Sequence, residues 1–271
     1  MPTGDSVVGS DGELAIRVGP WAKDKLFYIR RYCYIFNVGM KNKWPTRTYI
    51  DLFAGPGRCR IEGTGEEIDG SPLIALKCAV PFRYYFFNDI ETSLIESLQA
   101  RAKPPFDSAT INYFSRDCNE IIAELIQKLP SDSLDFCFID PTNWQITFDS
   151  IRRLTDGRRM DLALTFHVGG MKRTASNPPQ DLLDFFPDSN WQQEYEEARK
   201  ARRSIGRVLL EAYGRGLRDL GYRDIKDYVL EKNTRNVPLY YLVFASKNKR
   251  GAEFWDKIAS RSETGQIRMS I

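Results

Sequence analysis

The stretch Thr48-Tyr-Ile-Asp-Leu-Phe-Ala-Gly-Pro-Gly57 decides the fold that this sequence predicts. Residues suited to a buried strand surround the carboxylate of Asp51, and the small residues from Ala54 to Gly57 follow them. Glycine lets a backbone pass close to a ligand, and open α/β sheets build cofactor crevices where a strand ends in such a turn. An ordinary strand and turn show the same pattern, so the rest of the chain has to decide between the two.

The composition is that of a globular protein. The 271 residues are 42% hydrophobic and 13% aromatic, enough to bury the core of one large α/β domain over residues 1–271, with two small domains as the less favoured alternative. No stretch reaches the roughly 18 apolar residues of a membrane span, and Met1–Ser10 lacks the basic start of a signal peptide. We therefore expect a soluble, cytoplasmic protein with no membrane partner, whose oligomeric state the sequence leaves open.

The cysteines and the charge balance exclude some classes of function. The five cysteines are widely spaced without a C-x-x-C pair, and His167 is the single histidine, so we expect reduced, mostly buried thiols and no metal site. The net charge is +3, from 39 basic and 36 acidic residues. That excess is too small to argue for nucleic acid by itself.

Strand and helix patterns alternate along most of the chain. A helix is expected from Trp21 to near Gly39 because apolar residues recur there at helical spacing. The expected strands are 48–53, 83–89, 109–115, 134–140, 159–167, 225–230 and 239–245. Alternation with short links predicts a Rossmann-like, seven-stranded, mostly parallel sheet with helices on both faces, and the short link before the last strand predicts an antiparallel C-terminal pair.

Three segments do not fit the alternation. Residues 1–20 are polar and predict a loose arm, and residues 57–70 are a polar, glycine-rich loop that delays the next helix by about a dozen residues. Residues 168–190 predict a long loop with one short helical turn, and residues 191–220 predict a helix. We expect the whole insertion, 168–220, to be a lid or substrate region.

Acidic residues stand at the carboxyl ends of the first four strands of this series. They are Asp51, Asp89, Asp117 and Asp140. Parallel strands end at one edge of a sheet, where such folds bind ligands, so these side chains are expected to line one site. Carboxylates accept from ammonium, ribose hydroxyl and adenine amino groups but repel a pyrophosphate, which favours S-adenosylmethionine (SAM) over NAD.

In their order along the chain, these motifs resemble those of class I SAM-dependent methyltransferases. The matching positions are Asp51 to Gly57, Phe87-Asn-Asp89, Arg116-Asp117 and Ile139-Asp-Pro141. More narrowly, the chain from about Trp21 to Ile258 resembles the three-Cys-motif partner proteins, bacterial and phage proteins that occur beside a radical-SAM-like protein with a three-cysteine motif. The narrower likeness also uses Lys25, Gly70-Ser-Pro72 and Tyr241 to Ser246.

The resemblance implies a set of cofactor-binding residues. They are Asp51, Phe53, Gly55, Gly57, Asn88, Asp89 and Asp117. In such a site Gly55 and Gly57 approach the amino-acid part of SAM, and Asp51 accepts from its ammonium group. Asp89 takes the ribose hydroxyls, with Asn88 as its neighbour, and Asp117 faces the adenine amine. A helix N-cap explains Asp117 as well.

The fourth motif carries the expected acceptor chemistry. Cytosine C5 methylation needs a Pro-Cys nucleophile, and none of the five cysteines follows a proline. Amine methylation on adenine uses Asp/Asn-Pro-Pro-aromatic; here Asp140-Pro141-Thr-Asn-Trp144 keeps the acid and the first proline, with the aromatic residue one position late. We count Asp140, Pro141, Trp144 and His167 as catalytic candidates. Trp144 serves equally well as a cover of the sheet, and His167 as a hydrogen-bonded structural residue.

The sequence therefore supports three hypotheses. The first is a SAM-dependent methyltransferase acting on nucleic acid, with the basic clusters Lys172-Arg173 and Arg199 to Arg203 following the phosphate backbone, although a solvated helix face also explains the second cluster. The second is a non-catalytic partner subunit that serves a neighbouring radical-SAM-like three-Cys-motif protein. The third, a metal-dependent nuclease, uses Asp51, Asp89 and Asp140 around magnesium.

Overall fold

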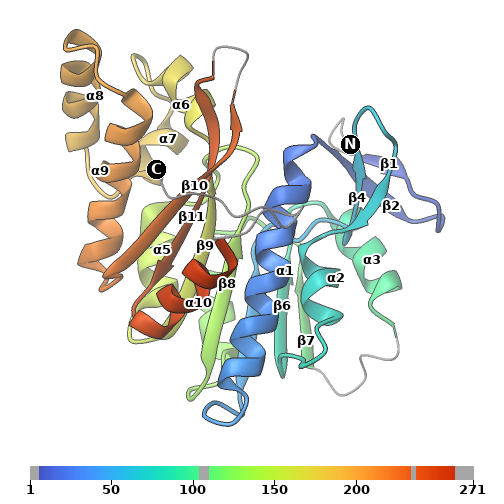
Figure 1. Ribbon diagram of the computed structural model, residues 1–271. Coiled ribbons are helices and arrows are strands. Elements are labelled where there is room, and N and C mark those ends of the chain that lie inside the picture. The colour runs from blue at the N-terminus through green and yellow to red at the C-terminus, as the bar shows by residue number, and fades with distance from the viewer. Residues whose placement is uncertain (1–5, 104–109, 233–235, 260–271) are drawn as a thin grey trace. The chain divides into compact units, whose positions relative to one another are not determined.

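The structure is a computed structural model that describes residues 6–103, 110–232 and 236–259 (Figure 1). Its contacts divide the chain into two compact units. Unit 1 comprises Met1–Ile139 and Glu253–Ile271, and unit 2 comprises Asp140–Ala252. The expectation of one domain over the whole chain stays a prediction. The proline stop expected at Pro104-Pro105 lies outside the described residues.

Seven strands form a mixed sheet in the order β10-β11-β9-β8-β3-β6-β7, which confirms the predicted Rossmann-like, seven-stranded architecture. Their bounds are β3 (Arg47–Asp51), β6 (Tyr84–Asn88), β7 (Thr110–Phe114), β8 (Leu134–Ile139), β9 (Arg159–Phe166), β10 (Asp224–Lys232) and β11 (Pro238–Ser246). In unit 1, β3 pairs with β6 and β8, and β6 pairs with β7, all in parallel. In unit 2, β11 is antiparallel to both β9 and β10, as the short link predicts.

The core of unit 1 forms around β3, all of whose residues are buried. Ile50 lies opposite Phe86 of β6 and Cys137 of β8, so the decisive stretch of sequence is central in this unit. Since parallel strands end at the same edge, Asp51 and the residues that follow β6 are brought together there.

Helices of unit 1 pack an aromatic layer against these strands. They are α1 (Trp21–Met40), α2 (Ser71–Leu76), α3 (Thr92–Arg101), α4 (Ile122–Lys128) and, from Glu253, part of α10 (Lys249–Ala259). Tyr32 of α1 is the centre of the layer, with ring centroids 4.7 Å from Phe136 and 5.5 Å from Trp255. Aromatic rings bury a large apolar area. Because one face of α1 packs against these rings, its apolar residues recur at helical spacing from Trp21 onward.

The expectation of a loose arm and a glycine-rich loop is wrong for the described residues. The arm contains β1 (Ser6–Val8) and β2 (Leu14–Val18), and the loop contains β4 (Arg58–Ile61) and β5 (Glu67–Asp69). These strands form a second sheet in the order β1-β2-β4-β5, in which Ile16 lies opposite Cys59 in a parallel pair. The strands are short and polar, and two of them pair with a segment about 40 residues away, which local pattern cannot reveal.

Unit 2 is more helical than the sequence indicates. Its helices are α5 (Phe148–Thr155), α6 (Val168–Thr174), α7 (Gln180–Phe185), α8 (Asn190–Lys200) and α9 (Ile205–Asp219). The predicted loop at 168–190 is wrong over α6, where Gly169 and Gly170 indicate a turn. A Cβ at Gly169 would lie 2.9 Å from Leu239 Cδ2, so close packing explains this glycine without a turn. The single helix expected at 191–220 is interrupted at Arg202, whose φ is +53°.

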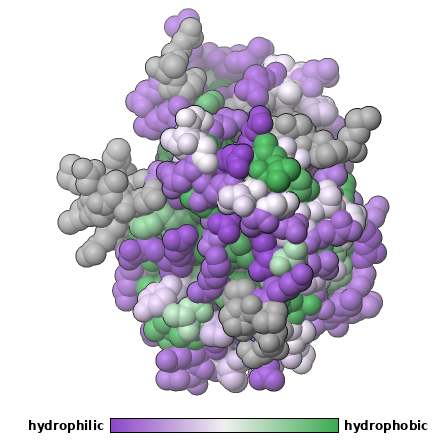
Figure 2. All heavy atoms as spheres, turned by 90° about the vertical axis from the view of Figure 1, so that its right-hand side faces the viewer, coloured by the Kyte–Doolittle hydropathy of each residue, from purple (hydrophilic) through white to green (hydrophobic). Residues whose placement is uncertain are grey.

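The surface shows few exposed apolar residues. Figure 2 shows a face that is mostly hydrophilic, with apolar residues in small separate groups. Among the largest exposed apolar side chains are Val8, at 63% exposure, and Ile90, at 64%. No helix in the described part of the chain has both the length and the apolar character needed to cross a membrane. All five cysteines are free and three of them are buried, as expected.

Candidate functional site

The turn after β3 requires its two glycines for different reasons. Gly55 has φ +57° and Gly57 has φ +77°, a left-handed conformation that other residues rarely adopt. A Cβ at Gly57 would lie 2.8 Å from Leu98 Cδ1, so this glycine is required by packing. A Cβ at Gly55 would meet only Ile16 Cγ1, at 3.9 Å, among the described atoms. Gly55 therefore borders open space in which a ligand can approach the backbone.

Asp89 connects the end of β6 to this turn. Its Oδ2 accepts from the Gly55 backbone N–H at 2.9 Å, and its Oδ1 accepts from the Glu91 N–H at 3.1 Å. No ion pair in the described part of the chain includes Asp89, and burial raises the pKa of its carboxyl. A carboxylate has about four acceptor positions, so both oxygens can accept another hydrogen bond. Additional neutral donors would stabilise this half-buried charge.

Asp51 is completely buried at the end of β3. Its Oδ1 accepts from the Phe53 N–H at 3.3 Å and its Oδ2 from the Tyr49 hydroxyl at 3.2 Å. Burial, followed by the nearby charge of Asp51, raises the pKa of Tyr49 well above its usual value, so the hydroxyl keeps its proton and donates. Phe53 is half-buried beside the turn. The role of Asp51 toward an ammonium group stays a prediction.

Asn88 uses its side chain within the protein. Its Nδ2 donates to the backbone carbonyls of Leu52 and Arg116, each at 3.1 Å, and its Oδ1 accepts from the Arg116 N–H at 3.4 Å. The amide thus links the ends of β3 and β7 to the end of β6. This geometry favours a role in holding the edge of the sheet together over direct contact with a cofactor.

Asp117 lies half-buried after β7. Its Oδ1 accepts from the backbone N–H of Asn119 at 2.7 Å and from the Asn119 side-chain amide at 3.0 Å. The N-cap of α4 is Ile121, so Asp117 is not the helix cap that the sequence offered as an alternative. Its contact with an adenine amine stays a prediction.

The β4–β5 hairpin explains the delayed helix after the turn. The Gly70 N–H donates to the Gly57 carbonyl at 2.8 Å, and α2 begins at the next residue. A Cβ at Gly70 would lie 3.1 Å from the Gly57 carbonyl carbon, so the two glycines allow this close return. The dozen intervening residues therefore leave the start of α2 beside the glycine turn.

Two side chains of this site were missed by the sequence reasoning. Ile90 follows Asp89 and is 64% exposed, although it is a large apolar residue. Ile16 of β2 is the closest side chain to the open side of Gly55. An apolar residue directly after a strand-end carboxylate is a signal that could have identified Ile90. Ile16 is identified only by the pairing of β2 with β4.

The acceptor candidates belong to unit 2. Asp140 begins this unit and is half-buried, and Pro141 is buried. Trp144 is 8% exposed, and its Nε1 is buried without a hydrogen-bond partner among the described residues. A Cβ at Gly170 would lie 3.1 Å from Trp144 Cζ2, so α6 covers the indole. This geometry favours Trp144 as a covering residue over a platform for a substrate base.

His167 contacts the segment 140–144 that carries Asp140 and Trp144. Its ring stacks on Tyr240, with centroids 4.3 Å apart, and it hydrogen-bonds the Thr142 backbone, while Nδ1 is buried without a partner among the described residues. Burial lowers the pKa of His167, and the charge of Arg173 adds to the decrease, although the bond to Thr142 acts in the opposite direction. The imidazole is therefore neutral near pH 7. This geometry favours a role for His167 in orienting residues 140–144 over a role in proton transfer.

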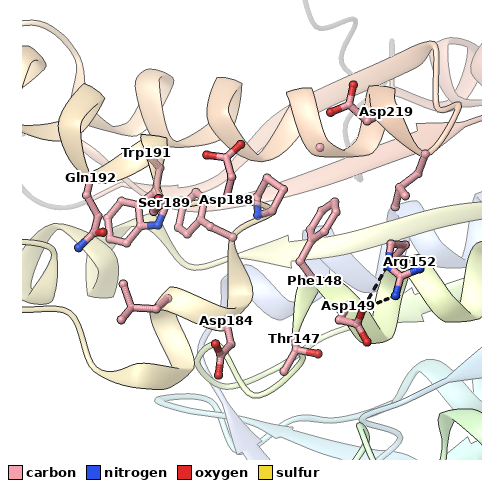
Figure 3. Close-up of a pocket in the computed structure, with 15 residues that line it drawn as sticks. Thr147, Phe148, Asp149, Arg152, Asp184, Asp188, Ser189, Trp191, Gln192 and Asp219 are labelled. Atoms are coloured by element: carbon pink, nitrogen blue, oxygen red, sulfur yellow. Dashed lines mark hydrogen bonds and ion pairs between the residues drawn. The ribbon is translucent and has the colours of Figure 1, made fainter.

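A separate cavity of about 690 Å³ lies within unit 2 (Figure 3). The start of α5, the residues between α7 and α8, and the end of α9 surround it. Its aromatic lining consists of Phe148, Phe186 and Trp191, and its acidic lining of Asp149, Asp184, Asp188 and Asp219. No residue predicted for the cofactor or the acceptor lines this cavity. Across residues 6–103, 110–232 and 236–259, no three His, Cys, Asp or Glu side chains come together as a metal site.

Comparison with known proteins supports the fold class. No protein-family model matches the chain, and neither does any curated protein. Protein LPL1258 from Legionella pneumophila str. Philadelphia 1 has a similar structure, with a TM-score of 0.56 and 10% identity over 88% of this chain and 90% of that one. At this identity the likeness concerns the fold alone.

Two methyltransferase structures are less similar. The METTL16 MTase domain has a TM-score of 0.46 and 12% identity over 90% of this chain and 87% of that one. The human methyltransferase 10 domain containing protein has a TM-score of 0.43 and 10% identity over 81% and 82%.

Proposed function

We propose that the chain binds SAM in unit 1 and transfers its methyl group to nucleic acid. The observation that carries this proposal is the half-buried Asp89 carboxylate, which accepts from the Gly55 N–H and has capacity for further donors beside the open side of Gly55. A ribose diol supplies two neutral donors without a second charge. SAM provides such a diol and no phosphate that this carboxylate would repel.

Each residue of the turn has a role in this proposal. Asp89 accepts from the ribose hydroxyls, and Gly55 leaves room for the amino-acid part. Ile90, exposed beside Asp89, offers an apolar surface to the adenine ring. Asp117 accepts from the adenine amine, and Asp51 from the ammonium group. Because its amide is committed within the protein, Asn88 positions Asp89 instead of contacting the cofactor.

The methyl acceptor we propose is an amine of a nucleic-acid base. Bound SAM supplies an electrophilic methyl group on a sulfonium, and methyl transfer then depends mainly on alignment. Asp140 accepts a hydrogen bond from the amine, and Pro141 and His167 hold the segment that carries Asp140. The exposed cation of Arg173 and the half-buried cation of Lys172 support a polyanionic substrate.

Calorimetric titration with SAM tests the cofactor. We expect wild type to bind and Asp89→Ala to lose at least about tenfold in affinity, since each lost charge-assisted hydrogen bond is worth roughly 1.5–3 kcal/mol. Glu96→Ala is the matched control, because Glu96 is an exposed carboxylate on α3 of the same unit. A wild-type protein that does not bind SAM would refute the proposal.

Transfer of a radiolabelled methyl group to DNA, RNA and protein fractions tests the acceptor. We expect label in a nucleic-acid fraction, lost in Asp140→Ala with SAM binding unchanged. Label found only in protein would refute the nucleic-acid part while leaving the cofactor part intact.

A second candidate is a SAM-binding partner subunit of a radical-SAM-like three-Cys-motif protein. The covered indole of Trp144 and the buried Nδ1 of His167 favour it, since neither group is exposed to a substrate. This candidate function also implies that the chain is a member of the three-Cys-motif partner family, which we propose together with it. Repeating the methyl-transfer assay with and without the neighbouring protein distinguishes the candidates, because activity of the isolated chain contradicts a purely non-catalytic role.

A further inference from the structure

Arg101, the last residue of α3, has a side chain that is only 5% exposed. Its Nε and Nη2 donate to the two carboxylate oxygens of Asp11, each at 2.7 Å. Its Nη1 donates to the backbone carbonyls of Leu14 and, at 2.7 Å, Pro56. One buried guanidinium thus binds two segments that are far apart in sequence.

The pairing with Asp11 is strong by its geometry. Two parallel N–H···O bonds from a planar guanidinium to a carboxylate fix both orientation and distance. The hydrogen bond to Arg101, with the charge of Arg101, lowers the pKa of Asp11 to about 2. A lysine at position 101 offers a point charge without this fork and cannot make the same four contacts.

Toward the turn, Arg101 completes a set of backbone contacts. In residues 55–57 the first N–H binds Asp89, the middle carbonyl binds Arg101, and the last carbonyl binds the Gly70 N–H. Each of the three consecutive residues is therefore held by a different segment. Removing one contact leaves a turn of positive-φ glycines with more conformational freedom.

Toward the N-terminus, Arg101 fixes β2. Asp11 lies in the β1–β2 connection and Leu14 begins β2, so both anchors define where this strand runs. β2 carries Ile16, the side chain nearest to the open side of Gly55. The contact that orders the turn therefore also places Ile16 beside it.

We propose that Arg101 is a positioning residue for the cofactor turn and that Ile16 of β2 forms one wall of the cofactor site. This inference rests on the proposed function. It makes the N-terminal strands, which look like a loose arm in the sequence, part of the binding site. A ligand seated against Gly55 contacts Ile16, and Arg101 keeps both in place before the ligand arrives.

Calorimetric titration with SAM tests the positioning role of Arg101. We expect Arg101→Lys to weaken SAM binding about 10- to 100-fold, as small displacements of a preorganised site do. Arg218→Lys is the control, since Arg218 makes an exposed ion pair with Glu211. If Arg101→Lys does not fold, Asp11→Asn replaces it, because it keeps the guanidinium and both carbonyl contacts, and we expect about a threefold loss. Unchanged affinity in the folded variant overturns the proposal.

A pair of variants on β2 tests the wall. Ile16→Ala removes the side chain facing Gly55, and Arg17→Ala changes the exposed neighbour on the same strand. We expect about a 3- to 10-fold loss of SAM affinity for the first, as for loss of a buried apolar contact, and none for the second. Equal affinities overturn the assignment of Ile16.

Hydrogen exchange separates failure of this inference from failure of the proposed function. We expect the amides of Gly55 and Gly70, which donate to Asp89 and to the Gly57 carbonyl, to exchange at least about tenfold faster in Arg101→Lys than in wild type, with no change in Arg218→Lys. If wild type binds no SAM, the proposed function and the cofactor roles of Arg101 and Ile16 are both refuted. Faster exchange in Arg101→Lys would then support only the stabilisation of the glycine turn by Arg101. Unchanged exchange in Arg101→Lys overturns the stabilisation of the glycine turn by Arg101, whether or not SAM binds.

Discussion

The glycine turn of unit 1 and the acceptor segment of unit 2, here residues 140–144 together with His167, differ in how their polar groups are satisfied. In the turn, residues 55–57 each make a backbone hydrogen bond to another segment. In the acceptor segment, Trp144 Nε1 and His167 Nδ1 are buried without a partner among the described residues. A buried polar group left unpaired costs about 1–3 kcal/mol.

This difference indicates which of the two regions is preorganised. The turn is held before any ligand binds, because its contacts come from Asp89, Arg101 and Gly70. The acceptor segment gains stability if a substrate or partner reorganises it and satisfies the buried nitrogens. We therefore expect mutations in the turn to affect stability and cofactor affinity, and mutations in the acceptor segment to affect turnover.

The largest effect is expected from Gly57→Ala. A Cβ there has a positive φ and lies 2.8 Å from Leu98 Cδ1, so we expect a loss of about 2–5 kcal/mol in unfolding free energy by urea denaturation. Gly12→Ala is the control: its φ is +85° and no atom lies within 4 Å, so only about 1–2 kcal/mol is expected. Equal losses would show that the turn is not tightly packed.

The next effect is a pH dependence carried by Asp89. Burial raises its pKa, so the folded protein retains a proton that the unfolded chain has already lost. This contribution to stability is present below the unfolded pKa, about 3.9, and is lost as pH rises through the folded pKa. The unfolding free energy of wild type minus that of Asp89→Asn should change with pH by at most about 1.4 kcal/mol per unit. A difference that does not vary with pH would contradict the burial effect.

A smaller effect, about tenfold in turnover, is expected from His167→Phe. Phenylalanine can keep the stack on Tyr240 but loses the bond to the Thr142 backbone, so the acceptor segment is less well oriented. The pH profile of methyl transfer should keep its shape. A loss of about 10²–10⁴ with a missing limb of the profile would instead identify His167 as the general base.

The smallest effect is expected from Lys172→Met. Burial lowers the pKa of this half-buried lysine, and loss of its charge should weaken nucleic-acid binding a few-fold and reduce the slope of log K against log salt by about 1. Lys200→Met is the control on an exposed helix end. If only the control weakens binding, the basic cluster near Arg199 to Arg203 is the contact surface.

Local pattern predicted the large sheet because its strands are strongly apolar and regularly spaced. The stretch 48–57 contains most of the inner strand β3 and the turn that follows it, and the antiparallel pairing of the last two strands followed from their short link. The same reasoning failed for β1, β2, β4 and β5, whose few apolar residues show no period. It also failed for α6, because Gly169 and Gly170 lie within a helix and pack closely against Leu239 and Trp144 instead of forming a turn.

The candidate site was predicted as a set of residue types and not as a set of contacts. The alternation of strands and helices placed Asp51 and Asp89 at one edge of the sheet. It gave no indication that the Asn88 side-chain amide donates to backbone carbonyls. Nor could it indicate that Trp144 is covered, because an aromatic side chain is equally suited to a core and to a substrate.

The sequence by itself determined which segments form the strands of the large sheet and which acidic residues follow them, since both can be read from periodicity along the chain. Only the tertiary structure decided that Arg101 joins Asp11 to Pro56 and that Ile16 borders Gly55. Those contacts join residues about 40 to 90 positions apart. No local preference encodes them, because they form only when the separate segments pack together.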